Sequence, residues 1–70
     1  MTVSESLAKG LSRARFNKGF TLEQLSILSK VSLNQISMIE NEKVMPNLRT
    51  LEKLALALDT KVFHLLKGDE

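Results

Sequence analysis

Side chains able to carry out covalent or metal chemistry are scarce in this sequence. Its 70 residues include no cysteine and a single histidine, His64. A zinc site needs several cysteine or histidine ligands, and acid–base catalysis needs titratable groups positioned in a cleft. A glycine-rich loop that could hold a phosphate is also missing. We therefore expect no enzyme activity, no cofactor, no metal site and no small-molecule ligand, which leaves recognition through non-covalent contacts.

The stretch SLNQISMIENEK, residues 32–43, carries side chains suited to recognition. At about 100° per residue, Ile36 and Ile39 define one side of a helix. The opposite side is nearly uncharged and consists of Leu33, Asn34, Ser37, Met38 and Asn41. A solvated helix face is usually rich in lysine and glutamate, so this face predicts contact with another molecule. The residues alone leave a second interpretation open, in which Leu33 borders the core and Met38 fills a gap in it.

Glu40 lies close to the isoleucine side of this helix, so its carboxylate is expected to need a partner within the protein. Arg15 stands beside the apolar stripe of an earlier helix, next to Leu11 and Ala14. A planar guanidinium can satisfy a carboxylate with two parallel hydrogen bonds. We predict an ion pair between Arg15 and Glu40 that joins the two helices.

Recurrent start signals mark where the helices begin. Thr21 is followed three residues later by Gln24, and Ser32 by Gln35, which predicts two capping boxes. Starts that lie this close leave room for a short helix and a tight turn. Further signals come from Asn47 as an N-cap and from Gly19 as a left-handed C-cap.

Strand signals are almost absent, and the chain is rich in good helix formers. We predict an all-α fold, a single domain over residues 1–70, with five short helices at about 4–17, 22–29, 33–41, 48–58 and 62–67. The first helix begins at Thr2 or Ser4. Helical spacing assigns these further residues to the core: Val3, Leu7, Leu11, Ala14, Leu22, Leu25, Leu28, Leu48, Leu51, Leu54, Ala55 and Leu58.

Charge and hydropathy bear on partners and location. The net charge is only +2, but it is uneven, because cations outnumber carboxylates in the first 30 residues and the chain ends in GDE; this asymmetry is compatible with a polyanionic partner. The longest aliphatic run, residues 54–58, is far shorter than the roughly 20 residues of a membrane span, and the N-terminus lacks a signal-peptide pattern. We expect a cytoplasmic protein with no membrane contact.

Residues 19–58 read GFTLEQLSILSKVSLNQISMIENEKVMPNLRTLEKLALAL. They resemble the phage Cro and repressor-like helix-turn-helix family, whose pattern runs glycine, apolar residue, Ser or Thr cap, EELA, a turn, VS, ISRIERGK, proline and LETLLKLAKAL. The likeness extends from Leu7 to Leu66 and includes the positions of Arg15 and Glu40. It implies a lambda-repressor-like DNA-binding domain in which the second and third helices form the helix-turn-helix. The third helix would lie in the major groove.

The resemblance also implies roles for individual residues. The likeliest readers of base edges are Leu33, Asn34 and Met38, beside Gln35 and Ser37, with Gln35 ranked lower because of its expected capping role. Contacts to DNA phosphates would come from Thr21, Asn41, Lys43, Asn47 and Arg49. An asparagine amide can bond adenine, and leucine or methionine can pack on a thymine methyl, so we expect A·T pairs opposite this helix.

Several residues depart from the family pattern. Leu22 replaces a frequent glutamine, and Lys30 replaces a frequent turn glycine, where a left-handed backbone would cost roughly 1 to 2 kcal/mol. Apolar residues also stand where the family usually carries charge: Phe16, Ile27, Leu56 and Phe63. Of these, Leu56 and Phe63 fall in the region of the family's two-fold interface and predict a homodimer contact. Phe16 and Ile27 either mark a further partner surface or pack beneath the chain termini.

The function implied is a sequence-specific, double-stranded DNA-binding transcriptional regulator that reads a palindromic or pseudo-palindromic operator as a homodimer. The alternative is a protein-binding module on the same scaffold, such as an antitoxin or an anti-repressor. The uncharged face of residues 33–41 and the apolar Leu22 keep that alternative open.

Overall fold

Five α-helices make up the part of the chain that the computed structural model describes, residues 2–68. They are α1 (Val3–Asn17), α2 (Leu22–Ser29), α3 (Leu33–Glu40), α4 (Leu48–Ala57) and α5 (Val62–Leu66), and these residues contain no strand. Each helix begins and ends within one residue of its predicted bounds. The prediction of an all-α fold with five short helices is confirmed.

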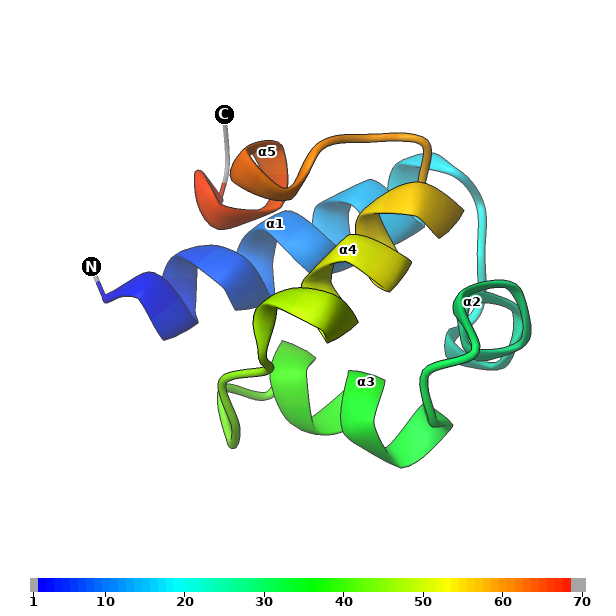
Figure 1. Cartoon of the computed structure of the whole chain (residues 1–70), viewed down its shortest axis with the longest axis horizontal. Helices are drawn as coiled ribbons and strands as arrows, with labels where there is room; N and C mark the ends of the chain where they lie inside the picture. Colours follow the sequence, from blue (N-terminus) through cyan, green and yellow to red (C-terminus); the bar gives the residue numbers. More distant parts are fainter. Residues whose placement is uncertain (1, 69–70) are drawn as a thin grey trace.

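The long helix α1 lies in the middle of the arrangement (Figure 1). It packs against α5 and against α3, while α2 contacts both α3 and α4, and α4 contacts α5. Figure 1 shows α3 and α5 at opposite edges of the molecule. None of the helices within residues 2–68 combines the length and the apolar character that crossing a membrane requires.

Every helix contributes to one apolar core. Its largest fully buried side chains are Leu7, Leu11, Leu25, Ile36, Ile39, Leu54, Leu58 and Leu65. Smaller or partly buried apolar groups complete it, and Ala14, Phe20 and Leu22 pack against its margin. The helical spacing therefore identified most of the core correctly.

Three residues predicted to be in the core are exposed instead. Val3, Leu28 and Leu48 expose 59%, 54% and 62% of their surface. Val3 and Leu48 are the first residues of α1 and α4, so they stand at helix ends, where fewer neighbouring side chains can cover them. In α2 the buried positions are Leu25 and Ser29, which turns Leu28 toward the edge of the stripe.

Left-handed residues terminate several helices. Gly19, with φ of +73°, follows α1, and two hydrogen bonds of a Schellman motif form there, from Gly19 N to Phe16 O (2.9 Å) and from Phe20 N to Arg15 O (3.1 Å). The predicted role of Gly19 is confirmed. Three residues that are not glycine also adopt this conformation, namely Lys30 (φ 62°), Glu42 (φ 61°) and Asp59 (φ 55°).

The turn between α2 and α3 is held by two serines. The Ser26 hydroxyl donates to the Val31 carbonyl (2.7 Å), and the Val31 N–H donates to the Ser29 hydroxyl (3.2 Å). Both polar backbone groups of the buried Val31 are thereby satisfied. Because this turn sets the angle between α2 and α3, the serines fix the geometry of the pair.

Gly10 allows α5 to approach α1 closely. This buried glycine faces the backbone of Leu65, and a Cβ atom added to it would overlap the Leu65 carbonyl oxygen and lie 2.8 Å from the carbonyl carbon. No flexible side chain is available to yield there, because the obstruction is backbone. The absence of a side chain at Gly10 is therefore a requirement of the α1–α5 contact.

We predict that Gly10→Ala lowers the free energy of unfolding, although alanine is the better helix former by about 1 kcal/mol. Overpacking against rigid backbone should outweigh that gain and leave a net loss of about 1 to 3 kcal/mol. Urea denaturation measures the difference, with Lys9→Ala, at the exposed neighbouring position, as the control. Equal or greater stability of Gly10→Ala would contradict the packing described here.

Candidate nucleic-acid interface

Helix α3 is oriented by its buried side. Ile36 and Ile39 are 0% and 1% exposed, and they set the rotation of the helix about its own axis. The helix begins at Ser32, whose hydroxyl accepts a hydrogen bond from the Gln35 N–H (3.1 Å). With its inner side committed to the core, α3 presents a defined outer side at the edge of the molecule (Figure 1).

The outer side brings together the residues expected to read bases. Leu33 is 42% exposed and Asn34 is exposed, while Gln35, Ser37 and Met38 are half-buried. The amide nitrogen of Asn34 lies 3.4 Å from the Met38 sulfur, a weak hydrogen bond between side chains one helical turn apart. The Leu33 side chain is therefore not a core residue, and Met38 is only partly enclosed.

The predicted capping box at Ser32 and Gln35 is only half formed. Thr21 and Gln24 make both reciprocal bonds, of 3.0 and 2.8 Å, so that box is confirmed. At Ser32 only the bond to the Gln35 backbone forms, and the Gln35 side chain does not return to the cap. The predicted capping role of the Gln35 side chain is therefore wrong.

Two helix N-termini lie among the residues expected to contact phosphates. Thr21 caps α2 and Asn47 caps α4, and both are exposed. The Asn47 oxygen accepts from the Thr50 N–H (2.9 Å), and within residues 2–68 this cap engages the oxygen alone. Its NH₂ group therefore remains able to donate to an anion, together with the unpaired N–H groups of the first helical turn.

Asn41 and Asn47 differ in which end of the side-chain amide is engaged. Asn41 donates from its NH₂ group to the Ser37 carbonyl (2.7 Å) and approaches the Ser37 hydroxyl (3.4 Å). A phosphate accepts hydrogen bonds and donates none, so an asparagine with its donors engaged offers it little. Among the expected phosphate contacts, Asn47 and the exposed cations Lys43 and Arg49 are thus better suited than Asn41.

The Arg15–Glu40 ion pair is present and joins α1 to α3. Arg15 Nε donates to Glu40 Oε2 (2.8 Å) and Nη2 donates to Glu40 Oε1 (3.0 Å), while Nη1 donates to the Phe20 carbonyl (2.9 Å). The side chains are only 19% and 10% exposed. Hydrogen bonding to Glu40, aided by its charge, raises the pKa of Arg15 against the opposing effect of partial burial. The guanidinium therefore stays charged at neutral pH.

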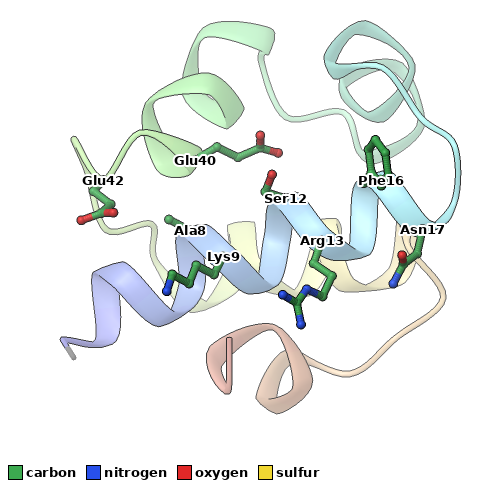
Figure 2. A pocket seen from close by; sticks show the side chains of 8 residues that line it. All are labelled: Ala8, Lys9, Ser12, Arg13, Phe16, Asn17, Glu40 and Glu42. Carbon is green, nitrogen blue, oxygen red and sulfur yellow. The ribbon is translucent and has the colours of Figure 1, made fainter. Parts of the chain in front are cut away.

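A hollow of about 570 Å³ lies beside this ion pair, between α1 and the end of α3 (Figure 2). Side chains of both signs line it, with Lys9 and Arg13 on α1 and Glu40 and Glu42 across from them. Figure 2 shows the Glu40 carboxylate directed toward α1. No group of three or more His, Asp or Glu side chains in residues 2–68 could hold a metal ion. The hollow thus has no single charge preference for a ligand.

The apolar departures from the family pattern lie on different surfaces. Phe63 is 52% exposed on α5, where its ring centroid lies 4.2 Å from that of His64 and 5.6 Å from Lys67 Nζ. Leu56 is 82% exposed and lines a hollow between α2 and α4 that does not include Phe63. Phe16 is 80% exposed and borders the hollow of Figure 2.

One residue at the edge of this surface was not identified from the sequence. Glu42 follows α3 in a left-handed conformation and stands between Asn41 and Lys43. It places a carboxylate next to a cation expected to meet phosphate. The hydrogen bond from Lys43 N to Met38 O (2.8 Å) closes the Schellman motif, whose left-handed position falls on Glu42.

Comparisons with known proteins agree with this geometry. A family model described as Helix-turn-helix matches residues 11–65. The restriction-modification controller protein C.AhdI from Aeromonas hydrophila superposes with a TM-score of 0.84 and 27% identity, covering 89% of this chain and 94% of that one. The clp gene regulator ClgR from Corynebacterium glutamicum gives a TM-score of 0.86 and 29% identity, covering 94% of this chain and 70% of that one. No match was found among curated proteins.

We predict that Arg15→Ala lowers the free energy of unfolding by roughly 3 kcal/mol, because it leaves the mostly buried Glu40 carboxylate without its partner. Chemical denaturation gives the value, and Lys9→Ala removes an exposed cation from the same helix as the control. If the two variants had the same denaturation midpoint, the pair would have no structural role.

Proposed function

Since the chain belongs to the helix-turn-helix family of Cro/C1-type transcriptional regulators, we propose that it binds double-stranded DNA sequence-specifically as a homodimer. In this proposal residues 1–70 act as one cytoplasmic DNA-binding domain. Helix α3 enters the major groove and α2 crosses the DNA backbone above it. The protein regulates by occupying a promoter and carries out no covalent chemistry.

The observation that carries the proposal is the uncharged outer side of α3. Two buried isoleucines hold it outward, and it combines the Asn34 amide with the apolar Leu33 and Met38. An amide can donate to and accept from adenine at once, and apolar side chains can contact the thymine methyl. The Gln35 amide, which has no capping role, adds a second possible base contact.

Phosphate contacts are proposed on both sides of α3. The N-termini of α2 and α4, capped by Thr21 and Asn47, point backbone donors and a positive dipole end at the anion. Lys43 and Arg49 add positive charge. Asn41 acts indirectly, because its NH₂ group donates to the Ser37 carbonyl at the end of α3. These contacts would position the protein, while α3 distinguishes the sequence.

A homodimer is proposed because one α3 reads only a few base pairs. Two copies related by a two-fold axis would place their recognition helices about 34 Å apart, on successive turns of a palindromic site. Of the two residues expected at the contact, Phe63 lies on α5, where His64 and Lys67 flank its half-exposed ring. Leu56 faces α2 across a separate hollow.

Selection of bound duplexes from random DNA tests the proposal. We expect two half-sites with dyad symmetry, rich in A·T pairs opposite α3. Affinity should fall steeply with salt, with a slope of about −0.9 in log K against log salt for each phosphate contacted.

Two variants separate base contacts from phosphate contacts. Asn34→Ala should lower the binding free energy by about 1 to 3 kcal/mol and relax the preference at one base pair. Lys43→Ala should weaken the binding of all DNA sequences alike and reduce the magnitude of the salt slope by about 1. Half-sites made only of G·C pairs would refute the assignment of α3. An affinity for duplex DNA that does not change with salt concentration would favour the protein-binding alternative.

We also predict that Glu42→Gly both stabilises the fold and raises DNA affinity. Glycine relieves a left-handed backbone that costs an ordinary residue roughly 1 to 2 kcal/mol, and the substitution removes a negative charge beside Lys43. Lys30→Gly is the control for stability, because it relieves the same backbone conformation in the turn between α2 and α3 without removing a negative charge. Thermal denaturation should show both variants stabilised, and only Glu42→Gly should bind DNA more tightly. An unchanged affinity would show that Glu42 lies outside the DNA contact.

A further inference from the structure

A second hollow, of about 510 Å³, lies between the carboxyl-terminal halves of α2 and α4. The residues that line it are Leu28, Ser29, Lys30, Lys53, Leu56 and Ala57. None of them belongs to the outer side of α3. The groove takes in the carboxyl-terminal half of α4, which Figure 1 shows directed away from α3, and the end of α2, from which a short turn leads into α3.

The floor and the rim of the groove differ in chemistry. Leu28 and Leu56, 54% and 82% exposed, come from separate helices and meet in one concave surface. A single exposed leucine is ordinary, but two that line one hollow form an apolar site. The rim carries the ammonium groups of Lys30 and Lys53, and within residues 2–68 neither takes part in an ion pair.

The charges of the groove select among possible occupants. No carboxylate lines it, and Glu52, the acidic residue next to Lys53 in α4, is exposed outside it. A second copy docked by two-fold symmetry would bring the same patch of both copies together and set four lysines around one apolar contact. Like charges opposed in this way disfavour the pairing. DNA could pair its phosphates with the two lysines but would leave the leucines uncovered, so it accounts for only half of the groove.

We propose that the α2–α4 groove docks another protein through a segment that presents apolar side chains flanked by carboxylates. The apolar groups would occupy the space between Leu28 and Leu56, and the carboxylates would pair with Lys30 and Lys53 at the rim. Such an arrangement places a desolvated apolar contact inside a charged border, as in ordinary protein interfaces. This inference does not depend on the proposed function.

A random peptide library, panned against the full chain, tests the proposal without assuming a sequence for the partner. We expect the enriched peptides to combine leucine, isoleucine or phenylalanine with aspartate or glutamate. A fluorescent copy of one such peptide should lose about tenfold in affinity for Leu56→Ser and for Lys53→Gln. Phe16→Ser, which removes an equally exposed apolar side chain outside the groove, should leave its affinity unchanged. Circular dichroism should show all three variants folded.

Several results would overturn the proposal. One is the absence of any enriched peptide, and another is enrichment of peptides without carboxylates or insensitive to Leu56→Ser. If Leu56→Ser dissociated a dimer in sedimentation equilibrium, the occupant would be a second copy. If Lys53→Gln weakened duplex DNA binding as much as peptide binding, the rim would belong to the DNA contact. DNA binding is measured separately from peptide binding. Failure of the groove proposal would therefore appear as lost peptide binding, and failure of the DNA-binding proposal as lost binding to duplex DNA.

Discussion

The rotation of α3 about its own axis is the constraint on which the rest of this small protein depends. Ile36 and Ile39 fix that rotation through burial, and Glu40 fixes it again through two hydrogen bonds to Arg15. A change of one helical position, about 100°, would place an isoleucine in solvent and a carboxylate in the core. The same contacts that stabilise the fold therefore decide which side chains reach a partner. Within residues 2–68, the one apolar core both stabilises the fold and holds this surface in place.

The connections around α3 are as constrained as its buried side. Two serines hold the turn before it, and Arg15 also donates to the Phe20 carbonyl in the segment that leads into α2. The chain nonetheless tolerates Lys30, Glu42 and Asp59 in left-handed conformations that glycine would adopt at lower cost. Stability is thus not maximal at these helix ends. The side chain gained at Lys30 is one of the two cations on the rim of the α2–α4 groove.

The sequence predicted the helices well because their limits are set by local chemistry. Thr21, Ser32 and Asn47 cap helices through bonds to backbone a few residues away, and Gly19 ends α1 in the same local way. Helical spacing identified the centre of the core but failed at Val3, Leu28 and Leu48, where coverage depends on how neighbouring helices end. The role of the Gln35 side chain was also beyond the sequence, because two hydrogen-bonding choices are compatible with the same motif. The expected members of the α3 outer side do lie together, whereas Leu56 and Phe63 proved to line different surfaces.

The electrostatics suggest how affinity would be divided in the proposed DNA complex. A net charge of +2 supports only weak attraction to any polyanion, and the outer side of α3 adds no charge to it. In that complex the discrimination among sequences would come from fit at Leu33, Asn34 and Met38, while Lys43, Arg49 and the helix N-termini would supply the salt-dependent attraction to phosphates. A second copy is the simplest way to raise affinity under this limit, because it doubles the base contacts without adding charge to α3. The α2–α4 groove, with lysines and leucines together, follows different chemistry. Together the two proposals give one small fold a nearly neutral surface for DNA on α3 and a basic, apolar surface for a protein between α2 and α4.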